Sequence, residues 1–423
     1  MVVGAVPLAP AVSSSPPVTS ATTPARLDSG LAPLPTARLV LAIGSLALGG
    51  FAFGTTEFVT MGLLPDIAAG VGIDIPTAGH LISAYALGVV VGAPTIAALG
   101  ARLPRRALLV GLMAAFLAGN VLTAIAPAYG SLLLARFVAG LPHGAYFGVA
   151  SLVAAALVTP DRRGRAVSSV MIGLAAANLA GVPAATWLGQ TAGWRAAFWA
   201  VVGLAALSIV SMVAVVPGTP GNPDAGVRQE LGALRRPQVL LTLLVGMIGF
   251  GGMFAMYTYI APLVTDVTGL SAGSVPLVLL VFGLAGVLGT ALGGRLADIA
   301  VFRSLVGALV AVGVLLAVLA LVAEHPVALV AAVFGVSMAT SVLVVNLQMR
   351  LMEVAGDAQM FGAALNHASL NLANALGAWL GGLVIAAGLG YTAPSLVGTG
   401  LAAVGLGVLA VSAVLRRRDP ADG

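Results

Sequence analysis

Residues 130–158 read GSLLLARFVAGLPHGAYFGVASLVAAALV, an apolar run whose only charged side chain is Arg136. A helix crosses the hydrocarbon core of a bilayer with roughly 20 apolar residues, so this run is long enough to do so. Its apolar residues are continuous rather than alternating, which disfavours the strand pattern of a membrane β-barrel. The stretch therefore predicts a membrane-spanning helix.

The rest of the 423-residue chain has the same character. Hydrophobic residues make up 60% of it and charged residues only 8%, against about 25% charged residues in an ordinary soluble domain. So few charges cannot cover the surface of a soluble protein of this size. We predict an all-α polytopic membrane protein with twelve transmembrane helices, at 39–63, 77–100, 106–126, 130–158, 166–190, 194–216, 238–264, 274–297, 303–323, 327–350, 361–387 and 391–415.

The connections between these segments divide the chain. Residues 1–36 are rich in Ala, Pro, Ser and Thr, which predicts a disordered N-terminal tail. A dispensable tail or a misassigned start codon is the plainer interpretation of this segment. The one long internal connection predicts two six-helix bundles: 37–216, then a linker at 217–237, then 238–415, with a short C-terminal tail at 416–423.

The arginines predict the orientation. If the N-terminus is cytoplasmic, all 19 basic residues except Arg136 and Arg195 fall in cytoplasmic segments. The positive-inside rule then places both termini, the tails and the linker in the cytoplasm. The net charge of +5 is therefore interpreted as membrane topology, with the lipid bilayer rather than nucleic acid as partner.

The two halves share a sequence pattern. Arg102 and Arg295 are 193 positions apart, as are Asn178 and Asn371, and Trp187 is 192 positions before Trp379. Two six-helix halves with the same orientation are parallel repeats about an axis along the membrane normal. In that architecture the substrate site lies between the halves near the midplane, and the halves rock to expose it to either side.

Two opposite charges inside predicted spans are candidates for proton coupling. Glu57 lies near the outer end of the first span, and Arg136 has a similar depth in the fourth. Charges inside a membrane are costly and rare, so each is a functional candidate. We expect the two side chains to approach each other or to face one polar cavity, where Glu57 could bind a proton. A static buried ion pair is the alternative.

Further polar residues in the spans are weaker candidates. His143, beside Pro142, could relay protons or could be a hydrogen-bonded packing residue. His367, Asn371 and Asn374 share one helical face, which could line a substrate cavity or form bonds between helices. Tyr257 could be a cavity aromatic or an interfacial anchor. The remaining cavity candidates are Asn178 and Asn346.

Enzyme signatures do not stand out in the sequence. It contains no Gly-x-x-x-x-Gly-Lys phosphate loop, no His-Glu-x-x-His metal helix and no cysteine. We therefore expect no enzymatic activity, no catalytic residue, no metal and no cofactor. The energy for transport then comes most simply from an ion gradient.

Three segments carry a resemblance to a known family: Gly54-Thr-Thr-Glu57-Phe, Leu132-Leu-Leu-Ala-Arg136-Phe-Val-Ala-Gly140-Leu-Pro-His143-Gly, and Gly181-Val-Pro183-Ala-Ala-Thr-Trp187-Leu-Gly189. With them, residues 38–415 resemble the major facilitator superfamily. They are more closely similar to its twelve-span drug:proton antiporters, in the branch of bacterial sugar-efflux and chloramphenicol-efflux permeases. The resemblance implies a multi-pass protein of the bacterial plasma (inner) membrane, acting as a monomer on protons and a small-molecule substrate.

Family motifs imply roles for several residues. The fourth-span arginine that the family links to proton coupling falls on Arg136. The fifth-span antiporter motif falls on Gly181 and Pro183, with Val182 between them where the family has Gly-Pro directly. The loop motif after the second span keeps Gly100 and Arg102 but has Pro104 where the family has an Asp, so it lacks the acid that the family's inter-half charge latch uses. The second half keeps the corresponding Gly294, Asp298 and Arg303.

These observations favour a proton-coupled efflux antiporter for a small, drug-like compound. The resemblance makes chloramphenicol-like drugs the first substrate to expect. Export of a sugar, a nucleoside or another metabolite is the first alternative. A channel or a transport-inactive sensor is an alternative of a different class, and a membrane enzyme is weaker still.

Overall fold

The computed structural model describes residues 34–100, 102–159, 162–218, 236–355 and 359–418. Most of the expected tail at 1–36, most of the linker at 217–237 and residues 419–423 lie outside this range. Where the structure describes the chain, its secondary structure consists of helices and contains no strand. The all-α prediction is confirmed.

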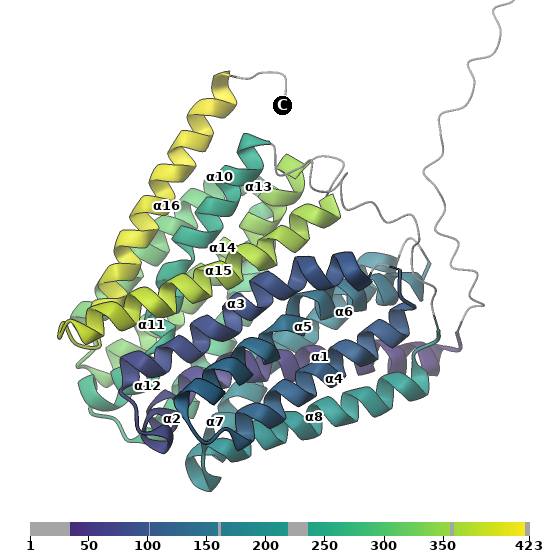
Figure 1. Ribbon diagram of the computed structural model, residues 1–423. Coiled ribbons are helices and arrows are strands. Elements are labelled where there is room, and N and C mark those ends of the chain that lie inside the picture. Colours follow the sequence, from purple (N-terminus) through teal and green to yellow (C-terminus); the bar gives the residue numbers. More distant parts are fainter. Residues whose placement is uncertain (1–33, 101, 160–161, 219–235, 356–358, 419–423) are drawn as a thin grey trace, which may run out of the picture. The chain divides into compact units, whose positions relative to one another are not determined.

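The first half of the chain folds into a set of long helices (Figure 1). They are α1 (Thr36–Gly62), α2 (Leu64–Val71), α3 (Ile75–Gly100), α4 (Arg105–Ile125), α5 (Tyr129–Ala156), α6 (Arg163–Ala176), the π-helical turn η2 (Ala177–Gly181), α7 (Val182–Ala192) and α8 (Trp194–Val215).

The second half is interrupted more often. Its elements are α10 (Pro237–Leu244), the π-helical η4 (Val245–Gly249), α11 (Gly251–Thr258), α12 (Ile260–Pro262), the π-helical η5 (Leu263–Val267), the 3₁₀ turn η6 (Ala272–Ser274), α13 (Val275–Val322), α14 (Pro326–Ala355), α15 (Gln359–Ala386) and α16 (Ala393–Arg418).

Eleven helices among the described residues are long and apolar enough to cross a membrane. One of them, α13, has 48 residues, or about 70 Å of helix, more than twice the thickness of a bilayer core. Its backbone leaves helical geometry at Ala300 (φ −167°, ψ 91°). The bend separates the expected spans at 274–297 and 303–323, so these helices provide the twelve predicted crossings.

The fifth crossing is α6, η2 and α7 in succession. Gly181 ends the π-helical turn, and Pro183 lies in the first turn of α7. Proline has no N–H to donate to the preceding turn, and in membrane helices a local π-helical adjustment can satisfy the backbone groups that it leaves free. A side chain at Gly181 would collide with Thr55 of α1. The two motif residues therefore lie where the fifth crossing changes from a π-helix to an α-helix, at its contact with the first crossing.

Glycines set the close approach of α3 to α5. A Cβ atom at Gly88 or Gly92 would collide with the carbonyl oxygen of Phe137 or Leu141 on α5. Helices in lipid associate through such close backbone contacts because lipid supplies no hydrophobic drive between them. The glycine spacing of the second span is therefore explained by packing.

The two halves of the chain contact each other along two helix pairs. The Ser83 hydroxyl of α3 donates to the carbonyl oxygen of Ala375 on α15 at 3.0 Å. On the other pair, Gly283 of α13 lies so close to η2 that a Cβ atom would collide with the carbonyl oxygen of Asn178. These pairs bring the second span beside the eleventh and the fifth beside the eighth.

A buried cluster joins the halves where α1 ends and α3 begins. It contains Met61 and Ile82 from the first half and Tyr259 from the second. The Tyr259 hydroxyl donates to the carbonyl oxygen of Ala378 at 2.9 Å. A side chain at Gly79 of the first half would collide with the same hydroxyl. The halves are therefore tightly packed at this end of the helices.

Candidate functional site

Glu57 lies where three helices from the two halves meet. Its side chain, on α1, is only 6% exposed. The Asn374 amide of α15 donates to its Oε1 atom at 3.4 Å, and Nε2 of His143 on α5 lies 3.9 Å from its Oε2 atom. The carboxylate thus contacts a hydrogen-bond donor from one half and a titratable ring from the other.

Arg136 is fully buried beside this carboxylate and is held through the neighbouring residue. Its guanidinium donates to the backbone oxygen of Thr56 at 3.2 Å and to the Thr56 hydroxyl at 3.3 Å. The hydroxyl in turn donates to Oδ1 of Asn120 at 2.5 Å. The ion pairs of the described chain do not include one between Arg136 and Glu57, although their charges interact. Arg136 and Glu57 therefore lie near each other, as expected, but the hydrogen bonds of Arg136 go to the neighbouring Thr56.

Tyr85 on α3 connects the arginine to the histidine, and sequence reasoning did not select it. Its ring lies 4.4 Å from the Arg136 guanidinium carbon, within range for a cation–π interaction. Its hydroxyl is 2.8 Å from Nδ1 of His143. The available signal was a phenol inside an apolar span, but tyrosines are common in membrane helices and this one carried no motif.

His143 belongs to an aromatic row that leads from the first half to the second. Its ring centroid lies 5.2 Å from those of Phe53 and Phe147. The Phe147 ring stacks parallel to His367 of α15 at 6.4 Å between centroids. The structure therefore brings both predicted histidines to the same place between the halves.

The predicted polar face of α15 lies at this place as well. Asn371 donates to the backbone oxygen of His367 at 3.0 Å. The side-chain oxygens of Asn371 and Asn374 are buried without a hydrogen-bond partner. A buried acceptor without a partner is costly, so these two amide oxygens are available to a ligand that brings donors.

Three other cavity candidates take part in contacts of their own. Asn178 bonds back to the carbonyl oxygen of Leu174 on its own helix, and Asn346 ties α14 to α13 through the carbonyl oxygen of Gly293. Tyr257 is 2% exposed and stacks on Phe282 at 4.2 Å. These side chains fill helix contacts, and Tyr257 lies inside the protein rather than at its surface.

The latch candidates lie at the other end of the helices. Gly100 packs against Leu108, where a Cβ atom would lie 2.8 Å from a methyl carbon. The side chains of Arg102, Asp298 and Arg303 are exposed. Within the described ranges, none of these three residues takes part in an ion pair.

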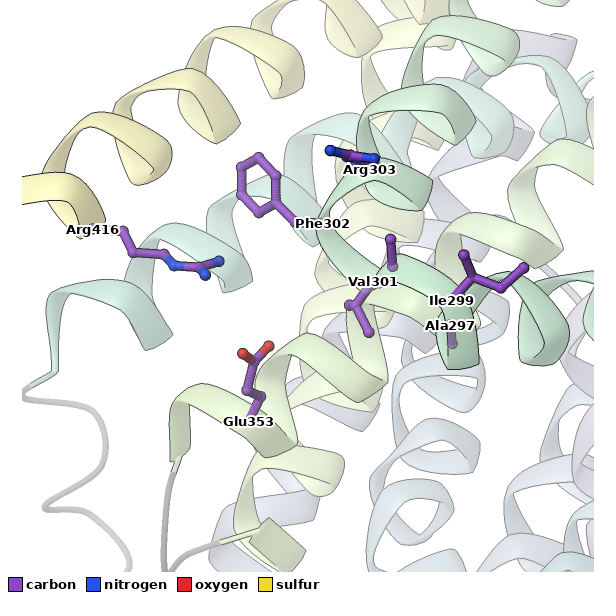
Figure 2. Close-up of a pocket in the computed structure, with 8 residues that line it drawn as sticks. Ala297, Ile299, Val301, Phe302, Arg303, Glu353 and Arg416 are labelled. Carbon is purple, nitrogen blue, oxygen red and sulfur yellow. The ribbon is translucent and has the colours of Figure 1, made fainter. Parts of the chain in front are cut away.

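A surface cavity of about 460 Å³ opens at the bend of α13 (Figure 2). Arg303 lines it from α13, Glu353 from α14 and Arg416 from α16. Glu353 already forms an ion pair with Arg350 at 2.9 Å. The cavity is built from the second half alone and contains none of the residues around Glu57. Among the described residues, no group of three or more metal-binding side chains comes together.

Comparison with known proteins agrees with this fold. The family model described as Major Facilitator Superfamily matches residues 46–360. The inner membrane transport protein YdhP of Escherichia coli (strain K12) is 44% identical over 378 residues, covering 89% of this chain and 96% of that protein. A chloramphenicol resistance protein of Streptomyces lividans is 37% identical over 361 residues, covering 83% and 90%. The crystal structure of a D-xylose-proton symporter matches with a TM-score of 0.65 at 16% identity, covering 86% of this chain and 96% of that one. This last likeness concerns the fold alone.

Proposed function

Because the chain belongs to the major facilitator superfamily, a family of multi-pass transporters, we propose that it is a proton-coupled antiporter. It exports a small drug-like compound by alternating access. It lies in a bacterial plasma membrane with both termini in the cytoplasm, as the arginine distribution indicates. The chloramphenicol resistance protein of Streptomyces lividans, 37% identical, supports the substrate class.

The observation that carries the proposal is the position of Glu57 between the halves. A carboxylate buried in a membrane span is costly when it is charged and unpaired. Its charged form is stabilised by the Asn374 amide, by the nearby Arg136 and by His143. Binding a proton removes much of that attraction. The protonation state of Glu57 can therefore bias how tightly α15 is held against α1, which is the coupling that an antiporter needs.

The polar and aromatic groups beside Glu57 support the substrate class. The free amide oxygens of Asn371 and Asn374 accept hydrogen bonds from hydroxyl or amide donors. The parallel rings of Phe147 and His367 offer a flat surface to an aromatic ring. A small neutral compound with an aromatic group and several donors fits these features.

The direction of access follows from the proposed topology. Under it, the packed end that contains Met61 and Tyr259 faces outward. The unpaired latch charges Asp298 and Arg303 then lie on the cytoplasmic side. The state described is accordingly closed towards the outside.

Purified protein in proteoliposomes tests the proposal. Imposing a pH gradient should drive accumulation of chloramphenicol, and adding the drug without a gradient should move protons in the opposite direction. Glu57→Gln should abolish both, whereas Glu324→Gln, the same change at an exposed acid, should leave both intact. Full gradient-driven transport by Glu57→Gln would overturn the proton role.

The same vesicles separate the alternatives. Stimulation of labelled-drug uptake by unlabelled drug inside the vesicles is expected of a carrier and contradicts a channel. Counterflow with a sugar or a nucleoside, but not with chloramphenicol, would identify a metabolite exporter instead.

A further inference from the structure

We propose that Tyr85 is a positioning residue for proton binding at Glu57, because its hydroxyl selects which ring nitrogen of His143 carries the proton. The inference rests on the proposed function and deepens it. Through Tyr85, the second span would take part in proton coupling, a role that no sequence motif indicates.

The geometry places the two neighbours of His143 at opposite ring nitrogens. The Tyr85 hydroxyl is 2.8 Å from Nδ1, and Oε2 of Glu57 is 3.9 Å from Nε2. In a neutral imidazole one nitrogen donates and the other accepts. The ring is neutral because a charged ring packed between Phe53 and Phe147 would be poorly solvated. Its two polar contacts are therefore linked: a change at one nitrogen reverses the role of the other.

Two arrangements satisfy this linkage. When Glu57 is charged, Nε2 carries the ring proton and points it at the carboxylate, while Nδ1 accepts from the Tyr85 hydroxyl. When Glu57 is protonated, its O–H points at Nε2, and Nδ1 carries the ring proton and donates to the Tyr85 oxygen. The arrangements differ by one proton, which Glu57 takes up from the solution on one side and releases to the other.

Tyr85 makes the two arrangements unequal. In the second, the hydroxyl hydrogen of Tyr85 needs another acceptor, and the hydrogen bonds of the described chain give this hydroxyl no partner besides His143. The charged group beside the Tyr85 ring is the Arg136 guanidinium. Arginine has no acceptor to offer. The first arrangement satisfies every group, so the hydroxyl favours the charged form of Glu57 and promotes proton release.

The ring of Tyr85 has a separate task. It covers the Arg136 guanidinium, and its position is fixed because α3 packs closely on α5, where a side chain at Gly140 would collide with the Tyr85 carbonyl oxygen. The ionisable groups that face His143 and Glu57 are accordingly Tyr85 from α3, Arg136 from α5 and His367 from α15. Only the hydroxyl makes a hydrogen bond to His143, whereas the ring packs edge-to-face against the imidazole and covers the guanidinium, so the two tasks can be separated by mutation.

Drug–proton exchange in proteoliposomes, measured against pH, tests the inference. Tyr85→Phe keeps the ring over Arg136 and removes the hydroxyl. It should move the midpoint of the pH profile upward by about half a unit to one unit, the size expected of one hydrogen bond, and leave the maximal rate within about twofold. Tyr85→Leu removes the ring as well and should also lower the maximal rate. Tyr146→Phe removes another buried tyrosine hydroxyl, one that donates to the backbone of Leu46, and should leave the midpoint unchanged.

An unchanged midpoint in Tyr85→Phe, with Glu57→Gln inactive, would overturn the inference and leave the proposed function standing. A fully coupled Glu57→Gln would instead remove the proposed function itself. Nitrogen-15 NMR of labelled histidine needs no variant: the chain has four histidines, and above the pH midpoint the His143 signal should show its proton on Nε2. A proton on Nδ1 at that pH would contradict the proposed role of Tyr85.

Discussion

The Asn374 amide donates to the Glu57 carboxylate across 3.4 Å, although 317 residues of chain separate them. One belongs to the eleventh predicted span and the other to the first, so this single contact joins the two halves at the charged site. The amide N–H is the donor in this contact, and an ionised carboxylate is a stronger acceptor than a protonated one. The hydrogen bond is therefore stronger when Glu57 is charged.

Asn374→Asp should change the pH dependence of transport. It places a second carboxyl group within hydrogen-bond distance of Glu57, and two neighbouring carboxylates cannot easily both ionise. One proton should then be held to higher pH, moving the midpoint of drug–proton exchange upward by about one unit or more. Asn374→Leu, which removes the donor without adding an acid, should give a smaller upward shift. Identical profiles for both variants and the wild type would contradict the contact's role.

Arg136→Lys should reduce transport at least about tenfold despite keeping the positive charge. A lysine cannot reproduce the forked donation to both oxygens of Thr56 or the flat contact with the Tyr85 ring. Arg195 provides a matched control, since it also lies over an aromatic ring, Trp194, and donates to a backbone oxygen. Arg195→Lys should retain most transport, and equal losses in the two variants would argue against a special role for Arg136.

Gly283→Ala should impair movement between the halves. Its methyl group would collide with the backbone of Asn178 in η2, whereas at Gly286 the nearest atoms, the hydroxyl oxygens of Ser337 and Ser341, are 3.5 Å away. We expect Gly283→Ala to lower the transport rate at least about tenfold, with the two helices held apart. Gly286→Ala should be close to wild type. Equal rates in the two variants, measured at equal amounts in the membrane, would count against this contact.

Asp74→Ala should destabilise the start of α3. The Thr77 side chain, together with the Thr77 backbone N–H that donates to the Asp74 carboxylate at 2.8 Å, places the pKa of Asp74 below its ordinary value of 3.8. A group with a lowered pKa stabilises the fold above its unfolded-state pKa and loses that effect as the pH falls through the lower value. At pH 7 the substitution should cost about 1 kcal/mol, seen as a lower Tm in detergent. Below about pH 3 the difference between variant and wild type should fade, and a cost that persists there would exclude the carboxylate as its source.

Much of the fold could be predicted from the sequence because lipid penalises exposed backbone polar groups and buried charge. That penalty leaves long apolar runs as a clear record of the crossings, and it makes Glu57 and Arg136 conspicuous. The break at Ala300 was marked in the same way, because Arg295, Asp298 and Arg303 interrupt the apolar run around it. The non-helical backbone at Ala300 itself left no such record, since alanine is ordinary in a helix.

The partners of the charged residues could not be predicted in the same way. Thr56, Asn120 and Tyr85 acquire their roles only when α1, α3, α4 and α5 pack together. Hydroxyl and amide groups are frequent in membrane helices, so their presence alone says little. The sequence singled out the α15 asparagines because they share one helical face with a histidine, while Asn178 and Asn346 have the same residue type without that arrangement.

The π-helical turn η2 (Ala177–Gly181) has a consequence for comparing this chain with its relatives. Such a turn accommodates one residue more than an α-helix following the same path, leaving the flanking turns in their original orientation. A relative in which this crossing is a regular helix should therefore be one residue shorter within Ala177–Gly181. It should still carry the equivalent of Trp187, 59% exposed in this structure, on the outer face of the bundle. The lost residue should then be visible as a one-position gap in an alignment, with the register of the helix unchanged on both sides.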